Sequence, residues 1–368
     1  MTIQYDHQIF CEQQFGGISR YFYELIKGAS QIEGIKAILD VKYSDNVFLQ
    51  KLQPDNSWLT HAKFKGKRDL IRLINYYNTK LVTSKNKFDI FHPTYFNSFS
   101  IQNAHGKPMV ITVLDLIDEK YHLNDPQFSS LIRNREKTIT AADYIIAISE
   151  NTKMDIIDYF GIDAKKVKVI YLGNSLEQNE IDAFEKNITT HSPYLLYIGS
   201  RKGKHKNIEN FIQAIGQVLK TEKELSVVFG GGGTFTNEEE KKFQRAGIEQ
   251  RVFQVPIKYD STLIGLFKNA SLFVYPSLYE GFGLPILEAF SCGTPCVISK
   301  GSSIEEVGLD AAAYFDPTNP EEMAKVVLDV YRYQQLQSEM SSAGLLRAKD
   351  FSWQNTVAET LAIYKSLT

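Results

Sequence analysis

Short apolar runs alternate with longer amphipathic segments along this chain. The apolar runs are rich in β-branched and aromatic residues and are bounded by Gly, Pro, Asp or Ser: MVITVLDLI, YIIAIS, VKVIYLG, YLLYIGS, LSVVFGGGG, LFVYPS and TPCVIS. Between them lie segments of helical periodicity, such as NIENFIQAIGQVLK and STLIGLFKNA. Buried strands that alternate with helices are typical of parallel sheets covered by helices. The pattern therefore predicts an α/β protein, in which ligands bind at the carboxyl ends of the strands.

The chain is long enough for two domains. Its 368 residues exceed the size that one hydrophobic core usually supports. The pattern stops in a polar, acidic stretch, and a second strand–helix series begins after it. We predict a first domain over residues 1–173, an interdomain connection over 174–193 and a second domain over 194–350. The final residues, 351–368, are predicted to form a capped amphipathic helix.

Composition and charge narrow the class of protein. A net charge of -2 and a pI near 6.4 give no reason to expect nucleic acid as a partner. Three cysteines without a disulfide-like framework suit a reducing cytosol. Cys292 and Cys296 lack a second Cys/His pair, so helix packing is favoured over a metal site. The sequence shows no signal peptide and no apolar stretch of about 18 residues, and we expect a cytoplasmic protein.

Two glutamates flank a glycine-rich turn in the stretch YEGFGLPILEA. The strand ends, breaks at Gly281 and Gly283, and restarts as a helix with Pro285 at its first position. Glu288 then falls within about one turn of the helix start, where the helix dipole favours a carboxylate. On these residues alone two interpretations stay open for Glu280 and Glu288: a charged first turn after a structural glycine turn, or a pair of ligand-binding carboxylates.

Two further loops follow strands of the same half. Arg201 and Lys206 lie in IGSRKGKHKN, between a strand and a helix, where cations and helix amides can bind an anion. A solvated basic loop is the alternative. The glycines of VVFGGGGT allow a ligand close to the backbone, but the segment lacks the Lys and Ser/Thr of a P-loop. Together, cations for a diphosphate and carboxylates for vicinal hydroxyls indicate a sugar nucleotide.

Six segments of the chain resemble one known family: FGGISRYFYEL, AADYIIAISENTKMDIIDYFGIDAKKVKVIYLGN, YIGSRKGKHKN, YEGFGLPILEAFSCGTPCVIS, GLDAAAYFDPTNPEEMA and FSWQNTVAETLAIYKSL. Over nearly the whole chain the sequence resembles the retaining glycosyltransferases of family 4, and the Glu-x7-Glu segment is highly specific for them. The resemblance implies the α/β GT-B fold, with two Rossmann-like domains facing each other across a central cleft. It also implies an acceptor-side first domain, a nucleotide-sugar-binding second domain and a last helix that packs back towards the first domain.

The resemblance implies roles for individual residues. Glu280 would contact hydroxyls of the transferred sugar, and Glu288 would hold the ribose hydroxyls. Arg201 and Lys206 would neutralise the diphosphate as it leaves, so Glu280, Arg201 and Lys206 are the implied catalytic residues. The remaining donor-binding residues would lie beside the phosphates and the acceptor (Gly16 and Gly17), at the base (Val255 and Pro256), and at the sugar and diphosphate (Gly281, Phe282, Gly283 and Leu284).

No Asp-x-Asp motif occurs in the sequence, so neither a metal nor a cofactor is expected. Arg201, Lys206 and a helix N-terminus can stabilise the developing charge without a metal. The family mechanism implies an oxocarbenium-like state in which the leaving phosphate assists deprotonation of the acceptor.

Leu114 departs from the family pattern, in which a histidine precedes the residue equivalent to Asp115. A leucine can neither donate a hydrogen bond nor share a proton. The change fits a deoxy-sugar donor, a slower enzyme, or an engineered or inactive protein. His92 lies at another strand end and is interpreted as a structural residue, not as a replacement.

Residues 61–87 combine Lys and Arg with interleaved apolar residues. A basic amphipathic helix can lie on an anionic membrane, and a first-domain helix with a solvated basic face is the slightly favoured alternative.

The sequence therefore predicts a retaining, metal-independent transferase that moves a hexose or deoxyhexose from a nucleotide sugar to a glycan or lipid-linked acceptor. The expected context is bacterial surface polysaccharide such as lipopolysaccharide O-antigen, in the cytoplasm or at the inner face of the membrane. A GDP-sugar, GDP-mannose above all, is preferred over a UDP-sugar on family habit only. The alternatives are a catalytically impaired sugar-nucleotide-binding protein, suggested by Leu114, and a nucleotide-sugar epimerase of the same architecture.

Overall fold

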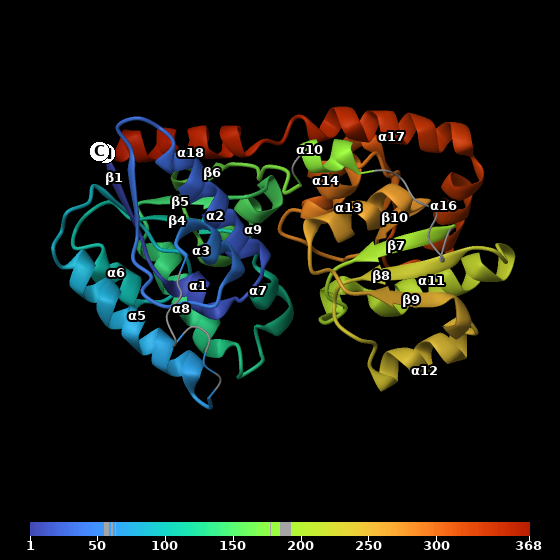
Figure 1. The fold of residues 1–368 in the computed structure, drawn as a ribbon, viewed down its shortest axis with the longest axis horizontal. Coiled ribbons are helices and arrows are strands. Elements are labelled where there is room, and N and C mark those ends of the chain that lie inside the picture. The colour runs from blue at the N-terminus through green and yellow to red at the C-terminus, as the bar shows by residue number, and fades with distance from the viewer. Residues whose placement is uncertain (55–58, 60–61, 63, 177, 185–192) are drawn as a thin grey trace. The chain divides into compact units, whose positions relative to one another are not determined.

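The computed structural model describes residues 1–368 except 55–58, 60, 61, 63, 177 and 185–192 (Figure 1). It contains two compact units, which are residues 1–173 with 353–368, and residues 174–352. Part of the predicted connection, residues 177 and 185–192, lies outside the described residues. Between them, α10 (Gln178–Ala183) belongs to the second unit, where Lys268 donates hydrogen bonds to the carbonyls of Ile181 and Phe184.

The first unit contains two three-stranded parallel sheets, in the orders β2-β1-β3 and β4-β5-β6. A bridge between Phe91 and Met109 connects them. In the first sheet Tyr5 pairs with both Leu39 and His92. The strands are β1 (Thr2–Tyr5), β2 (Lys36–Leu39), β3 (Ile90–His92), β4 (Val110–Val113), β5 (Tyr144–Ala147) and β6 (Val167–Val169).

Helices connect and cover these strands. The apolar side chains of β4 and β5, such as Ile111 and Ile145, form one core cluster with Ile139 and Ile156 from two of the helices. The helices are α1 (Gln8–Glu12), α2 (Gly17–Ser30), α3 (Val47–Leu52), α5 (Lys67–Thr83), α6 (Phe99–Asn103), α7 (Ile117–His122), α8 (Ser129–Ala141), α9 (Glu150–Phe160) and α18 (Trp353–Leu367).

The second unit contains one six-stranded parallel sheet in the order β12-β11-β10-β7-β8-β9. Alternate residues of its strands face opposite sides, as the pleat requires. Leu272 and Val274 join a core cluster with α11 and α16, whereas Phe273 lies edge-on to Phe267 of α13. The strands are β7 (Tyr194–Ile198), β8 (Ser226–Gly230), β9 (Val252–Val255), β10 (Leu272–Tyr275), β11 (Cys296–Ser299) and β12 (Ala312–Phe315).

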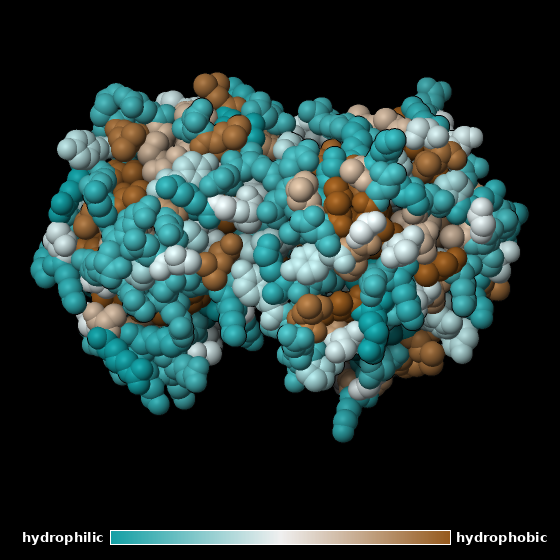
Figure 2. All heavy atoms as spheres, turned by 180° about the vertical axis from the view of Figure 1, so that it is seen from behind, coloured by the Kyte–Doolittle hydropathy of each residue, from teal (hydrophilic) through white to brown (hydrophobic). Residues whose placement is uncertain are grey.

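Helices cover both faces of this sheet, because each face is apolar. On the side of the molecule in Figure 2, the hydrophobic residues that remain exposed lie in small patches among hydrophilic ones. The helices are α11 (Ile208–Thr221), α12 (Asn237–Ala246), α13 (Asp260–Asn269), α14 (Leu284–Ser291), α15 (Ile304–Gly308), α16 (Pro320–Arg332) and α17 (Gln334–Ala348).

The last helix, α18, belongs to the first unit and packs on α2. The buried hydroxyl of its Tyr364 hydrogen-bonds the hydroxyl of Tyr5 and Nδ1 of His92. The second ring nitrogen of His92 lies 3.1 Å from Oγ1 of Thr112. Burial lowers the pKa of His92 to about 3, so the ring is neutral at pH 7. His92 is therefore a buried structural residue, as the sequence interpretation expected, and it helps to hold α18.

Tyr364→Phe should destabilise the folded protein by about 1–3 kcal/mol, because it leaves Nδ1 of a fully buried histidine without its partner. Urea unfolding of the two proteins measures this difference. Tyr333→Phe is a matched control, since Tyr333 is 66% exposed, and it should change stability by less than about 0.5 kcal/mol. Equal stability of both variants would contradict the structural role of the Tyr364 hydroxyl.

Candidate functional site

The predicted site residues of the second half follow three neighbouring strands. β10, β7 and β8 are adjacent in the sheet and parallel, so their carboxyl ends meet at one edge. β7 is the first strand of this unit in the chain and lies inside the sheet, with β8 on one side and β10 on the other. Such a reversal of strand order is where α/β folds bind ligands. The topology thus brings together Arg201, the glycine turn and the turn at Glu280.

The loop after β7 is held by Asn207. This residue has a left-handed backbone conformation (φ 57°), which asparagine tolerates better than most residues. Its side-chain amide donates to the carbonyl oxygens of Pro276 at 2.9 Å and Pro317 at 2.7 Å. Because these prolines lie in the loops after β10 and β12, Asn207 connects three loops at the sheet edge. A short 3-10 helix, Lys204–Lys206, precedes it and presents Lys206.

Lys206 and Glu280 form an ion pair. Nζ of Lys206 lies 2.7 Å from Oε1 of Glu280, and the two side chains are 16% and 11% exposed. Burial raises the pKa of Tyr275 well above its ordinary value, and the adjacent Glu280 carboxylate, to which the phenol is hydrogen-bonded, raises it further. The phenol therefore stays protonated. Lys206 and Glu280, which are 74 residues apart in sequence, thus form one polar centre. Both side chains are mostly buried but keep some contact with solvent.

The turn between β10 and α14 is built by hydrogen bonds to its backbone. Oγ of Ser303 donates to the carbonyl oxygens of Glu280 at 2.8 Å and Phe282 at 3.1 Å. Gly283 has φ +113°, a conformation that favours glycine, and α14 begins at the next residue, Leu284. Pro285 is the second helical residue, one place later than the sequence pattern predicted. Gly281 and Phe282 are buried within this turn.

Glu288 is the fifth residue of α14 and is only 7% exposed. It lies one turn into the helix, as predicted, with the first-turn amides of α14 directly before it. A carboxylate this buried is rare on a helix unless it has partners. The burial favours a specific role over a solvated first-turn charge, which was the alternative for this residue.

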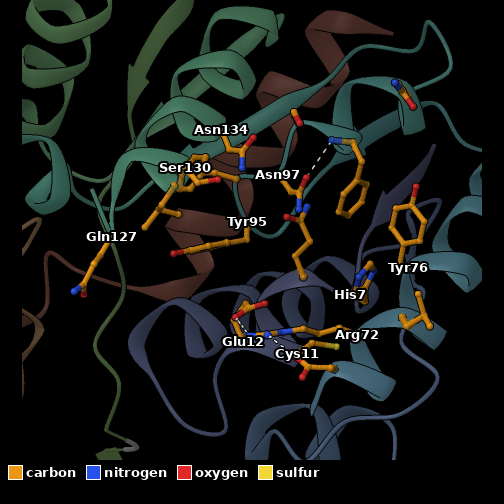
Figure 3. A pocket seen from close by; sticks show the side chains of 18 residues that line it. His7, Cys11, Glu12, Arg72, Tyr76, Tyr95, Asn97, Gln127, Ser130 and Asn134 are labelled. Carbon is orange, nitrogen blue, oxygen red and sulfur yellow. Dashed lines mark hydrogen bonds and ion pairs between the residues drawn. The ribbon is translucent and has the colours of Figure 1, made fainter. Parts of the chain in front are cut away.

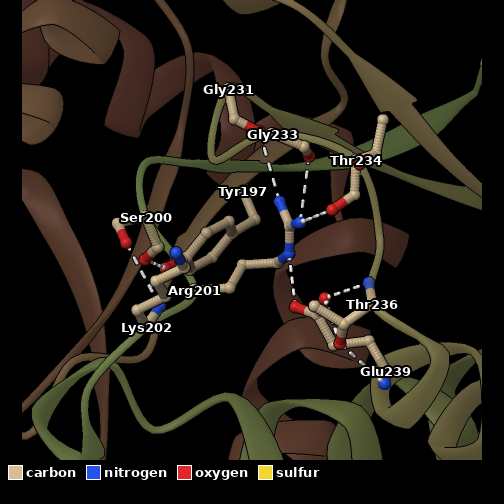
Figure 4. A network of polar contacts seen from close by, with 9 residues as sticks. All are labelled: Tyr197, Ser200, Arg201, Lys202, Gly231, Gly233, Thr234, Thr236 and Glu239. Atoms are coloured by element: carbon tan, nitrogen blue, oxygen red, sulfur yellow. Dashed lines mark hydrogen bonds and ion pairs between the residues drawn. The ribbon is translucent and has the colours of Figure 1, made fainter. Parts of the chain in front are cut away.

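Arg201 lies inside a dense polar network (Figure 4). Its Nε donates to Oε1 of Glu239 at 2.6 Å, and its side chain is 3% exposed. The terminal nitrogens donate to the carbonyl oxygens of Gly231 at 3.2 Å, Gly233 at 3.0 Å and Thr234 at 3.1 Å. The guanidinium also lies over the ring of Phe235, 4.9 Å from its centroid.

The glycine turn after β8 is shaped around this guanidinium. Gly231, Gly232 and Gly233 all have φ between 71° and 80°. A Cβ on Gly232 would come within 2.6 Å of a terminal nitrogen of Arg201 and 2.7 Å of the carbonyl oxygen of Gly199. In this structure Arg201 therefore holds the turn in place, a contact that the basic-loop interpretation did not include.

The predicted base-binding residues lie next to the same turn. Val255 ends β9, and its carbonyl oxygen accepts a hydrogen bond from the amide of Gly231 at 2.9 Å. Pro256 follows and is exposed. The backbone of the β9 loop is thus fixed relative to the glycine turn, while its surface remains accessible.

The other predicted positions lie in the first unit. Gly16 is the N-cap of α2, and its carbonyl oxygen accepts from Oγ of Ser19 at 3.0 Å. Gly17 opens α2, and a Cβ there would meet no atom within 4 Å. Leu114 directly follows β4 and is buried. Among the described residues, no group of three or more His, Cys, Asp or Glu is placed to hold a metal ion.

Two family models match the chain. The model described as Glycosyltransferase Family 4 matches residues 15–178, and the one described as Glycosyl transferases group 1 matches residues 178–347. Together with the fold, they define this protein as a glycosyltransferase. The chain belongs to glycosyltransferase family 4, the family that its motifs resemble.

One similar protein is the O-antigen chain mannosyltransferase B of Escherichia coli, which is 27% identical over 95% of this chain and 96% of its own. The solved structure of Anabaena HepE in complex with UDP and glucose has a TM-score of 0.72 at 18% identity, covering 98% of this chain and 99% of that one. Sucrose-phosphate synthase of Thermosynechococcus elongatus has a TM-score of 0.74 at 16% identity, covering 100% and 99%. These structures confirm the predicted GT-B fold.

Several residues of the site were not found from the sequence. Four residues hold the predicted ones in place: Glu239, Asn207, Ser303 and Tyr275. The first three are distant in sequence from the groups that they contact, whereas Tyr275 ends the strand that leads into the turn at Glu280. Only Glu239 had a local signal, since Thr236 and Glu239 form a capping box at the start of α12. That signal predicts a helix start but not the contact with Arg201.

Glu239→Gln should destabilise the protein by about 1.5–3 kcal/mol, because it removes the charge that pairs with a buried guanidinium. Burial alone would raise the pKa of Glu239, but the hydrogen bonds from Arg201 and Thr236 outweigh it, and the pKa is lowered. The carboxylate therefore stabilises the fold at neutral pH, and this contribution is lost as the pH falls through its folded pKa. Urea unfolding at pH 7 and at lower pH measures both effects.

The matched control is Glu238→Gln, on the exposed face of the same helix turn. It should change stability by less than about 0.5 kcal/mol. If Glu239→Gln behaves like this control at pH 7, the Arg201 network does not stabilise the second unit.

Proposed function

We propose that this protein is a retaining hexosyltransferase that transfers mannose from GDP-mannose to a glycan or lipid-linked acceptor of a bacterial surface polysaccharide. The single observation that carries the proposal is the Lys206–Glu280 pair at the carboxyl edge of the second-unit sheet. It places a cation and a sugar-binding carboxylate beside the start of α14. The similarity to a mannosyltransferase of O-antigen synthesis favours mannose and this polysaccharide class.

The donor is proposed to bind along the three loops of that edge. Lys206 and the first amides of α14 supply positive charge for the diphosphate. Glu280 accepts hydrogen bonds from the transferred sugar, and the buried Glu288 accepts them from the ribose. The end of β9 and the loop after it, at the half-buried Val255 and the exposed Pro256, hold the base. For Gly16 and Gly17, at the start of α2, the proposal keeps the role that the family resemblance implies, beside the phosphates and the acceptor.

Lys206 is proposed as the main cation for the leaving diphosphate. It contacts a single carboxylate, whereas Arg201 is held by Glu239 and three backbone carbonyls. Phosphate oxygens are charged acceptors, stronger than neutral carbonyls, and can replace the carbonyls around the guanidinium. Arg201 then contributes to the diphosphate site while Glu239 keeps it in position.

We propose that catalysis requires no metal and no cofactor. In this proposal the negative charge that develops on the leaving group is stabilised by Lys206, Arg201 and the dipole of α14, since preorganised positive groups stabilise such charge. The departing phosphate then assists deprotonation of the acceptor hydroxyl, and the sugar keeps its anomeric configuration.

Leu114 supports a second candidate function. Its apolar side chain is buried directly after β4, where the family motif carries a histidine. A protein with this change could bind the sugar nucleotide and transfer sugar slowly or not at all. Donor hydrolysis without acceptor separates the two candidates, because only an active transferase releases free sugar.

The acceptor is proposed to be reached at a membrane surface. No helix in the described part of the chain is both long and apolar enough to cross a bilayer. Residues 61 and 63 of the predicted basic segment lie outside the described residues, and α5 covers residues 67–83 of it. Leu70, Leu73, Tyr77 and Leu81 are exposed at spacings of three and four along this helix. An exposed apolar stripe with flanking lysines suits peripheral binding on the cytoplasmic face.

Thermal unfolding with GDP, UDP or ADP, each with and without magnesium, tests the donor assignment. A nucleotide at 100-fold above its dissociation constant should stabilise the protein by about 2.7 kcal/mol. We expect GDP to give the largest shift and magnesium to leave it unchanged. Glu288→Ala should weaken nucleotide binding by about 1.5–3 kcal/mol, since a charged acceptor for two hydroxyls is lost.

Glu321→Ala, at an exposed glutamate of α16, is the control and should bind the nucleotide like the wild type. A folded Glu288→Ala protein with unchanged affinity would remove Glu288 from the ribose site. The absence of a shift with all three nucleotides would contradict the transferase proposal as a whole.

Sedimentation with anionic lipid vesicles at low salt tests the membrane proposal. The wild-type protein should sediment with the vesicles, and a Tyr77→Ser/Leu81→Ser double variant should stay in solution, because these side chains are 60% and 62% exposed. Leu346→Ser removes an equally exposed leucine from α17 and should sediment like the wild type. Failure of the wild type to sediment at any salt concentration would exclude α5 as a docking helix.

A further inference from the structure

A large pocket opens in the first unit, and none of the residues that line it was assigned to the donor (Figure 3). It lies beyond the carboxyl ends of β1 and β3, where the chain enters α1 and the segment before α6, and α5 and α8 complete its walls. Its volume is about 930 Å³, at the upper end of the range for small-molecule sites. This position at the carboxyl edge of a parallel sheet is where such folds bind ligands.

One wall of the pocket is aromatic and held rigidly. Tyr76 lies edge-on to Phe99 with ring centroids 5.2 Å apart, and His7 stacks on Phe99 at 5.8 Å. His7 is itself fixed by a 2.8 Å hydrogen bond between its Nδ1 and Oγ1 of Thr79. Tyr95 contributes a further ring that is only half-buried. Flat rings in fixed positions can pack against the C–H face of a sugar ring.

The remaining walls are polar. The side-chain amides of Asn97, Gln127 and Asn134 and the hydroxyl of Ser130 line the pocket. In Figure 3, Asn134 and Asn97 lie along one side, and Glu12 and Arg72 lie along the other. Amides both donate and accept hydrogen bonds, as sugar hydroxyls do. A few convergent polar groups on an aromatic background are the general design of a small-molecule site.

The charges of the pocket disfavour an anionic ligand. Among the described residues that line it, Arg72 is the only lysine or arginine, and Glu12 and Asp69 are the carboxylates. Arg72 pairs with Glu12 and, at 3.4 Å, with Asp69. Burial lowers the pKa of His7, so its ring adds no positive charge at pH 7. Any phosphate or carboxylate would meet excess negative charge and a cation that is already neutralised.

We propose that this pocket binds the uncharged, non-reducing end of the glycan acceptor. The rings of Tyr76 and Tyr95 contact the apolar face of the sugar, while Asn134 and the opposite carboxylates hydrogen-bond its hydroxyls. The proposal rests on the proposed function, because an acceptor exists only if the protein transfers sugar. It adds that the accepting sugar carries no phosphate or carboxylate, whatever charge the remainder of the acceptor has.

Saturation-transfer NMR with methyl α-mannoside and with its 6-phosphate tests this proposal without needing turnover. The neutral glycoside should bind, and the phosphate should bind about tenfold more weakly. Asn134→Ala and Tyr95→Ala should each weaken binding of the neutral glycoside about tenfold, through a lost hydrogen bond and a lost ring contact. Asn124→Ala, at an exposed position outside the pocket, should bind the glycoside like the wild type.

Each outcome separates this proposal from the transferase proposal. Equal or tighter binding of the 6-phosphate, or binding of the neutral glycoside that neither variant weakens, would overturn the pocket assignment. If the wild type binds no glycoside yet is stabilised by a nucleotide, the pocket assignment fails and the donor site stands. If the glycoside binds in the pocket and no nucleotide does, the saccharide site stands and the transferase proposal fails. Tyr95→Ala needs a folding check by circular dichroism, and Asn134→Ala keeps the test decisive if that variant unfolds.

Discussion

The ion pair between Lys206 and Glu280 is the contact on which the candidate site depends. It exists because β7 and β10 are neighbouring parallel strands, so that the loops that follow them leave the same edge of the sheet. Moving either strand by one place in the sheet would separate the cation from the carboxylate. Asn207 and Ser303 then fix the two loops by donating hydrogen bonds to backbone carbonyls. The charged side chains of Lys206 and Glu280 are therefore not needed to hold the loops and can bind a ligand.

Arg201 and Lys206 are two cations of one loop whose side chains have different partners and different accessibility. Both lie in the same short basic segment, and both were assigned to the diphosphate. In the folded chain the Arg201 guanidinium binds Glu239 and the turn carbonyls, where its planar array of donors suits several acceptors at once. Lys206 meets one carboxylate and stays partly accessible. A firmly held guanidinium and a more accessible ammonium together suit a diphosphate, which gains negative charge as it leaves the sugar.

The two units divide the proposed chemistry between them. The second unit carries cations and carboxylates suited to a sugar nucleotide, and the first contains an aromatic and amide-lined pocket in which Arg72 is paired with carboxylates. In the two proposals this difference in charge separates the substrates, because the diphosphate requires positive charge and a neutral saccharide does not. The C-terminal helix α18 completes the first unit through Tyr364, so the chain crosses between the units more than once.

The sequence alone determined the fold class, most strands of the second unit and the family, because these follow from local patterns: apolar runs, glycine turns and the Glu-x7-Glu segment. It did not reveal β1, β2, β9 and β12. The runs of β1, β2 and β9 mix apolar with polar residues, and β12 begins with two alanines, which are depleted in strands. Only the tertiary structure decided which distant groups meet. Glu239 meets Arg201, Ser303 meets the turn at Glu280, and the walls of the first-unit pocket come from separate elements. No local pattern records contacts that strand order and helix packing create.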